Sequence, residues 1–165
     1  MTITIGIPTI ILLVILQSTI VSRLNLSFGS ADIVMLVLIA LGLQQNTKRT
    51  LLWFTIGGLL MALISSIPLM YPLIPYIIIS LIIDFLRKRI WKIPLLLMIM
   101  VSFFGTIICN LAAFVIINIT RVTLPLASSV NSVILPSAAL NIILGIPIFL
   151  LVKDWSKWLN PRDEE

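Results

Sequence analysis

The sequence predicts an all-α integral membrane protein, a bundle of about six transmembrane helices in a single domain of residues 1–165. Hydrophobic residues make up 60% of the chain and charged residues 10%, with a mean hydropathy of +1.21, so there are too few polar groups to cover a water-soluble domain. Most apolar residues fall in runs close to the roughly 20 residues of a helix that crosses a bilayer. Between two apolar halves lies the basic stretch Arg87-Lys88-Arg89-Ile90-Trp91-Lys92, which is typical of a cytoplasmic loop.

Six segments are expected to span the membrane, and they cover residues 3–20, 28–43, 51–69, 73–86, 93–117 and 133–152. No Lys or Arg precedes the first segment, so we expect an uncleaved helix rather than a signal peptide. Pro75 falls in the first turn of the fourth segment, where proline is tolerated, whereas Pro136 and Pro147 predict kinks in the last. Tyr71 and Tyr76 are expected at the outer membrane interface.

The second segment is the weakest of the six. Its apolar run, Ile33 to Leu43, is about half of the spanning length, and extending it back to residue 28 admits Asp32. Each Ile, Val or Leu favours insertion by roughly 0.3 to 0.6 kcal/mol, whereas Asp costs about 2.5 to 3.5 kcal/mol at mid-bilayer. Insertion is therefore marginally favoured, and Ser30 or Asp32 is expected to cap the start of this helix. A five-span chain that lacks this segment is the alternative.

The distribution of Lys and Arg predicts the orientation of the chain. With six spans and the N-terminus inside, Arg23 and Arg121 lie outside and the other nine basic residues are cytoplasmic. These nine are Lys48, Arg49, Arg87, Lys88, Arg89, Lys92, Lys153, Lys157 and Arg162. A five-span form with the N-terminus outside would also satisfy the rule, and both forms place the C-terminus in the cytoplasm. Because orientation explains the positive charge, no nucleic-acid partner is expected.

Small and polar residues recur at intervals of four along three of the spans. Such rows allow another helix backbone to approach closely, or supply hydrogen bonds between helices. Together with Asp32, the candidate contact residues are Gly58, Ala62 and Ser66 in the third span, Asn110 in the fifth, and Ser137, Asn141 and Gly145 in the last. Packing within the same bundle is the favoured interpretation, and contact with a partner protein is the alternative.

The sequence contains no group of residues typical of a catalytic or metal site. There is no His, the single Cys109 lies in an apolar run, and the acidic residues before residue 154 are Asp32 and Asp84. No paired carboxylates, Ser-His or Cys-His arrangement, or glycine-rich phosphate loop is present. We therefore expect no enzymatic activity, no metal and no cofactor. Asp84 is expected to form an interfacial ion pair with Arg87 or Lys88.

Three short motifs resemble those of a bacterial membrane protein family. They are Leu16-Gln17-Ser18-Thr19 at the end of the first span, Ala31-Asp32-Ile33 at the start of the second, and Leu135-Pro136-Ser137-Ala138-Ala139-Leu140-Asn141 in the last. With the length and span pattern of the whole chain, they are similar to the rod-shape-determining membrane protein MreD. The chain departs from that family at Met61-Ala62-Leu63-Ile64-Ser65-Ser66, where the family often has an acidic residue and glycines.

The resemblance implies a non-enzymatic scaffold of the cell-elongation machinery in the bacterial cytoplasmic membrane. Members of the family bind the bitopic protein MreC and help couple MreB filaments to the peptidoglycan synthases RodA and a class B penicillin-binding protein. Their fold also resembles the substrate-binding subunits of energy-coupling-factor transporters, so a vitamin-binding subunit is the alternative function. Such a subunit needs an outer pocket lined by several polar or aromatic groups. The turn from Pro68 to Pro75 is apolar and only the loop from Arg121 to Asn131 is polar, which favours the scaffold.

Overall fold

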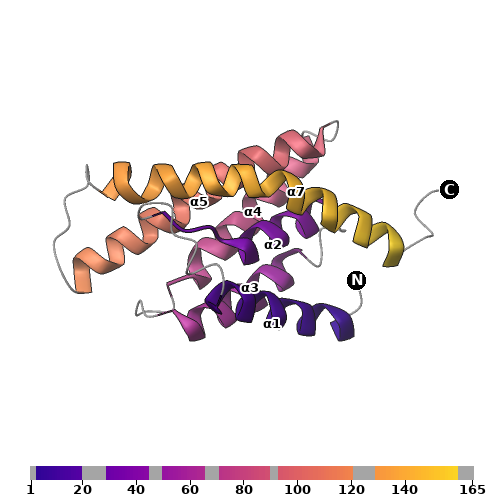
Figure 1. The fold of residues 1–165 in the computed structure, drawn as a ribbon, viewed down its shortest axis with the longest axis horizontal. Helices are drawn as coiled ribbons and strands as arrows, with labels where there is room; N and C mark the ends of the chain where they lie inside the picture. Colours follow the sequence, from indigo (N-terminus) through magenta and orange to yellow (C-terminus); the bar gives the residue numbers. More distant parts are fainter. Residues whose placement is uncertain are drawn as a thin grey trace.

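All regular secondary structure is helical in the computed structural model, which describes residues 3–19, 29–44, 50–65, 71–89, 93–120 and 129–159. Six α-helices and one short π-helical segment follow one another along these ranges (Figure 1). They are α1 (Ile3–Thr19), α2 (Ile33–Gln44), α3 (Thr50–Ile64), α4 (Leu73–Arg89), α5 (Pro94–Thr120), η3 (Val130–Ile134) and α7 (Leu135–Leu159). The predicted all-α fold is confirmed.

Each predicted span contains one of these α-helices, with differences at the ends. α4 continues to Arg89, because its last turn carries three successive basic residues that suit the negative end of the helix dipole. α3 ends at Ile64, whereas the prediction reached residue 69, and residues 66–70 lie outside the described part of the chain. The last predicted span corresponds to η3 followed by α7, which contains Pro147 and bends in its second half (Figure 1).

The second predicted span is the one that the structure changes most. α2 begins at Ile33, and Gly29 to Asp32 form an extended segment that runs along the bundle towards it (Figure 1). A helix rises 1.5 Å per residue and an extended chain about 3.3 Å, so α2 covers roughly 18 Å and the extended segment roughly 13 Å more. The prediction of a helix from residue 28 is therefore wrong for residues 29–32, although the whole stretch covers a similar length.

α2 is the central helix of the bundle. It packs against α1, α3, α4, α5 and α7, and every residue from Val34 to Gly42 is buried. A helix that is apolar on all sides is stable only where no face meets water, which is the place that α2 occupies. The helices around it each leave apolar residues exposed on the outside of the bundle.

A side chain from α4 forms a hydrogen bond with the backbone at the C-terminal end of α2. Arg87 Nη1 donates to the carbonyl oxygen of Gly42 at 3.2 Å, one of the carbonyls that a helix leaves unpaired at its end. The positive charges of Lys88 and Arg87, the two expected partners, act on the carboxylate of Asp84. Asp84 Oδ1 itself is buried without a hydrogen-bond partner among the described residues. Arg87 therefore fixes α4 to α2 as well as contributing to the basic stretch.

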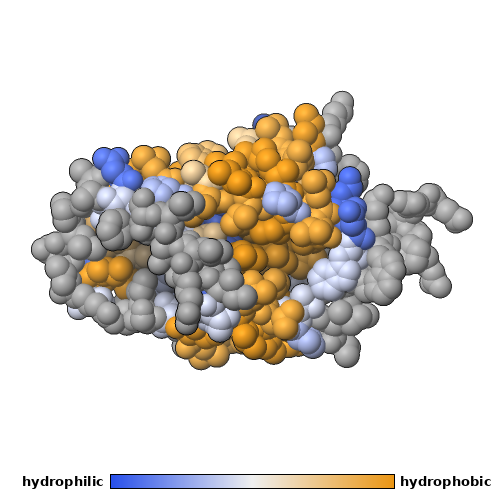
Figure 2. All heavy atoms as spheres, viewed as in Figure 1, coloured by the Kyte–Doolittle hydropathy of each residue, from blue (hydrophilic) through white to orange (hydrophobic). Residues whose placement is uncertain are grey.

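The face of the bundle shown in Figure 2 carries a broad hydrophobic band along its middle, with more hydrophilic described residues to either side. Leu12, Phe85 and Leu151 are examples of large apolar side chains on the surface of the bundle, each more than 60% exposed. Two helices, Pro94–Thr120 and Val130–Trp155, are long and apolar enough to cross a membrane, and three shorter apolar helices accompany them.

Candidate functional site

The extended segment before α2 has backbone groups that belong to no helix. It lies where α1 and α3 finish and where α2 and α4 begin, which we call the Asp32 end of the bundle. Gly29 and Ala31 are buried. Buried backbone N–H and C=O groups need hydrogen-bond partners, so side chains from other helices have to supply them here.

Gln17, near the end of α1, binds this backbone with both ends of its side-chain amide. Its Nε2 donates to the carbonyl oxygen of Ala31 at 2.7 Å, and its Oε1 accepts from the N–H of Ile33 at 2.9 Å. A side-chain amide suits this task because it carries a donor and an acceptor side by side. Gln17 therefore joins α1 to the start of α2.

Two polar residues of α7 bind the same segment. Ser137 Oγ accepts from the N–H of Ser30 at 3.1 Å, and Asn141 Oδ1 accepts from the N–H of Asp32 at 2.9 Å. Asn141 Nδ2 donates in turn to Thr106 Oγ1 of α5 at 2.9 Å. Since both α7 side chains are buried, these bonds are shielded from water and link α7 and α5 to the segment.

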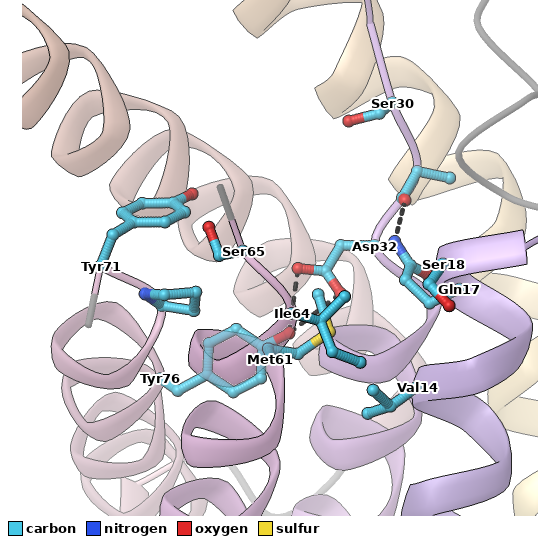
Figure 3. Close-up of a pocket in the computed structure, with 12 residues that line it drawn as sticks. Val14, Gln17, Ser18, Ser30, Asp32, Met61, Ile64, Ser65, Tyr71 and Tyr76 are labelled. Atoms are coloured by element: carbon cyan, nitrogen blue, oxygen red, sulfur yellow. Dashed lines mark hydrogen bonds between the residues drawn. The ribbon is translucent and has the colours of Figure 1, made fainter. Parts of the chain in front are cut away.

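Asp32 ends the extended segment and caps α2. Its Oδ1 accepts from the N–H of Met35 at 2.9 Å, the bond typical of an N-cap residue. Tyr76 of α4 shares its hydroxyl proton between the two carboxylate oxygens, at 3.0 Å from each (Figure 3). Tyr76 is 1% exposed, so its side chain lies inside the bundle rather than on its surface.

These contacts form one connected network, which we call the polar clasp. It consists of Gln17, Asp32, Tyr76, Thr106, Ser137 and Asn141, together with the backbone of the extended segment. All three motifs that carry the family resemblance contribute to it, although the first and the last are more than 100 residues apart along the chain. The clasp therefore joins α1, α4, α5 and α7 around the start of α2.

The clasp requires the extended segment to lie directly against α7. A Cβ atom at Gly29 would come within 2.7 Å of both the Pro136 Cβ and the backbone nitrogen of Ser137. Backbone atoms cannot move aside as the end of a flexible side chain can. The extended segment can lie against Pro136 and Ser137 of α7 because Gly29 has no side chain.

A cavity of about 410 Å³ lies beside the clasp (Figure 3). Its described lining comes from the end of α1, the extended segment, the end of α3 and the start of α4. The polar and aromatic members of this lining are Gln17, Ser18, Ser30, Asp32, Ser65, Tyr71 and Tyr76. These groups come from four separate segments, so a partly polar cavity forms beside the turn although the turn itself is apolar in sequence.

The glycines of the two predicted small-residue rows lie at contacts inside the bundle. A Cβ at Gly58 would be 3.2 Å from the Cα of Leu73, so α3 and α4 meet closely there. Gly145 is buried, and a Cβ at this position would lie 3.5 Å from Met98 Cε, which is ordinary contact. The structure thus uses Gly58 and Gly145, like Ser137 and Asn141, in packing within the bundle.

The other candidate residues stand apart from the clasp or outside the described chain. Asn110 Nδ2 donates to the carbonyl oxygen of Thr106 on its own helix at 2.9 Å, and Ala62 is half-buried on α3. Ser66 lies outside the described residues. Conversely, Gln17 and Tyr76 were absent from the predicted contacts. A polar amide near the end of an otherwise apolar helix is the signal that could have identified Gln17.

The clasp is made of paired polar groups, and the structure gives it no nucleophile or acid-base pair. In the described ranges, no group of three or more His, Cys, Asp and Glu residues could hold a metal ion. The thiol of Cys109 is buried, with its Sγ 3.9 Å from Met35 Sδ. What this end of the bundle offers is a rigid support for α2 with a partly polar cavity beside it. Comparison of the chain with protein families, curated proteins and solved structures found no match.

Proposed function

We propose that this chain is a multi-pass protein of the bacterial cytoplasmic membrane that acts as a scaffold for cell elongation, as MreD does. The observation that carries the proposal is the polar clasp. Motifs that resemble the family at three distant places in the sequence form one unit in space, because the first and the last motif hydrogen-bond to the backbone at the second. This is expected if the motifs are the structural signature of a shared bundle.

The surface of the bundle supports a membrane location. Large apolar side chains are exposed on α1, α3, α4, α5 and α7, and a water-soluble monomer rarely carries so extensive an apolar surface. Arg87, Lys88, Arg89 and Lys153 belong to the end of the bundle opposite Asp32. That arrangement fits the positive-inside rule, with the Asp32 end outside the cell.

The extended segment supports six spans rather than five. α2 alone covers roughly 18 Å, which is too short for a hydrocarbon core of about 30 Å. With the roughly 13 Å of the extended segment, the stretch from Gly29 to Gln44 reaches about that thickness. Non-helical backbone is tolerated at membrane depth where protein surrounds it and pairs its polar groups, and the clasp meets that condition.

A cysteine introduced at position 2 tests this topology. In the six-span form, Thr2→Cys is expected to react with a membrane-impermeant maleimide only after the cells are permeabilised. The natural Cys109 is buried, so the unmodified chain serves as the control for background labelling. Labelling of intact cells at position 2 would contradict the six-span topology.

Binding of a partner is expected through exposed helix faces, with MreC as the expected partner and MreB, RodA and a class B penicillin-binding protein in the wider complex. The predicted rows are occupied by internal packing at Gly58, Ser137, Asn141 and Gly145. The loops predicted between the spans are short, so recognition is expected to use packing of helices and few hydrogen bonds.

Depletion in the rod-shaped cells that produce the protein tests the scaffold function. We expect depleted cells to become round, and we expect the tagged protein to co-purify with MreC from detergent-solubilised membranes. An unrelated multi-pass protein carrying the same tag is the control for co-purification. Cells that stay rod-shaped after complete depletion would refute the proposal.

The cavity favours a second candidate function, the substrate-binding subunit of an energy-coupling-factor type transporter. Its volume of about 410 Å³ falls within the range of small-molecule sites, and several polar groups converge on it. A thermal-shift screen of vitamins on the purified chain tests this function. Stabilisation by one vitamin at micromolar concentration, with normal cell shape after depletion, would favour the transporter subunit over the scaffold.

A further inference from the structure

We infer that the cavity at the Asp32 end binds a cationic group, an ammonium or a guanidinium, at the carboxylate of Asp32. The inference rests on the charge and hydrogen-bonding groups of the cavity. It is independent of whether the chain serves as a scaffold or as a transporter subunit, because a cationic group can belong to a small molecule or to a Lys or Arg side chain of a partner.

Asp32 is the one acidic residue among the described lining residues. The lining contains no Lys, Arg or His, so no cation of the described lining faces the carboxylate. The side chain is half-buried and its oxygens lie beside the cavity (Figure 3). A carboxylate withdrawn from water is stabilised most by an opposite charge in contact with it. The cavity leaves room for such a charge to come from outside the chain.

The carboxylate also keeps free capacity to accept hydrogen bonds. Its two oxygens offer about four acceptor sites. Two protons occupy them, one from the N–H of Met35 and one that the Tyr76 hydroxyl shares between both oxygens. Among the described residues, the second oxygen, Oδ2, receives only this shared proton, so it can accept further hydrogen bonds from a ligand.

Two hydroxyl groups of the lining donate their protons to protein carbonyls. Tyr71 donates to the carbonyl oxygen of Cys109 at 2.9 Å, and Ser18 donates to that of Ile15 at 2.9 Å. The Tyr71 oxygen, once its proton is used in this way, can still act as an acceptor. A carboxylate and a hydroxyl acceptor in the same cavity suit a ligand rich in hydrogen-bond donors, and ammonium and guanidinium groups are of this kind.

The size of the cavity and its single carboxylate select an organic cation over a metal ion. A volume of about 410 Å³ is far larger than one ion requires. Calcium sites use six to eight oxygen ligands, usually with several carboxylates. The described lining offers one carboxylate, whereas an ammonium or guanidinium needs only one and leaves the apolar part of the cavity, with Val14, Met61 and Ile64, to contact a hydrocarbon chain.

Two organic cations and one uncharged compound test the inference on the full chain in detergent or nanodiscs. We expect n-butylguanidinium and n-butylammonium to raise the melting temperature in a concentration-dependent manner. Uncharged N-butylurea, which has nearly the shape of the guanidinium, is expected to bind at least tenfold more weakly. Equal binding of N-butylurea, or no binding of either cation at millimolar concentration, would overturn the inference.

Variants of the cavity give a second test. Asp32→Asn keeps an oxygen for the cap but removes the charge, and it is expected to weaken n-butylguanidinium binding at least tenfold. Asp84→Asn removes a carboxylate at the opposite end of α4 and is expected to leave binding unchanged. If Asp32→Asn does not fold, Ser65→Lys places an ammonium in the cavity of a chain that keeps Asp32. The ammonium of Ser65→Lys is expected to weaken n-butylguanidinium binding by competing for Asp32. If Ser65→Lys or a folded Asp32→Asn binds n-butylguanidinium as tightly as the wild type, the proposed site is contradicted.

The source of the cation is identified from protein purified out of its native membrane. A free small molecule is expected to appear as a low-mass cation in mass spectra after denaturation. A partner side chain is expected instead as a co-purifying protein that n-butylguanidinium releases. Either result supports the cationic site, whereas a co-purified anion or neutral ligand that protects Asp32→Asn equally well would exclude it.

Discussion

Replacement of Gly29 by Ala is expected to destabilise the bundle strongly. Among the described glycines whose added Cβ would meet backbone atoms, Gly29 has the shortest such contact. The new Cβ would lie 2.7 Å from the backbone nitrogen of Ser137 and 2.9 Å from the carbonyl carbon of Pro136. To relieve the overlap, the extended segment must move away from α7, which lengthens the hydrogen bond from Ser30 to Ser137. We expect a loss near the upper end of the roughly 1–3 kcal/mol typical of overpacking.

Gly145→Ala is the matched control for this prediction. Its added Cβ would meet neighbours at 3.5 Å or more, and Ala is favoured over Gly inside a helix by roughly 0.8–1.0 kcal/mol. Thermal unfolding of both variants in the same detergent is expected to show a clear loss for Gly29→Ala and no loss for Gly145→Ala. Equal melting temperatures for Gly29→Ala and the wild type would show that α7 does not lie against the extended segment.

The second large effect is expected at Asp32. Leucine in its place removes the acceptor for the Met35 N–H and for the Tyr76 hydroxyl, which is buried at 1% exposure. Each unpaired buried group costs about 1–3 kcal/mol. Asp32→Asn keeps an oxygen that can accept from both donors, so it is expected to lose about 1 kcal/mol or less.

Comparison of the two Asp32 variants separates a structural carboxylate from an obligatory charge. If the side chain serves the fold, Asp32→Leu is expected to lower both the amount of folded protein and the melting temperature, while Asp32→Asn keeps the function proposed above. Tyr76→Phe serves as a control, because it removes the hydroxyl and leaves the cap to Met35 intact. Equal and complete loss of function in both Asp32 variants, at normal membrane levels, would contradict the structural role.

Much of the helical pattern can be predicted from the positions and lengths of the apolar runs in the sequence. Long apolar runs such as Pro94–Thr120 give helices because a backbone without water must pair its own polar groups. The place of Asp32 at the start of α2 also follows from the sequence, since a short acidic side chain before an apolar helix is a typical cap. Ser137 and Asn141 are identifiable as contact residues because polar groups inside an apolar helix need partners.

The extended segment and the clasp could not be derived in the same way. Whether residues 29–32 continue a helix depends on Gln17 and Asn141, which lie on other helices and pair with this backbone only after the bundle has formed. Gly29 carries no local sign that Pro136 will lie against it. The cavity likewise depends on four segments that are separate in sequence. Such features arise from tertiary packing, which overrides local preferences.

Amide hydrogen exchange at Asp32 and Ile33 tests the central claim most directly, namely that side chains of α1 and α7 hold the backbone before α2. The clasp predicts slow exchange of both N–H groups in the wild-type chain. It also predicts that Asn141→Leu accelerates exchange mainly at Asp32 and that Gln17→Leu accelerates it mainly at Ile33. Unprotected exchange at both positions in the wild type, or rates that neither variant changes, would contradict the clasp.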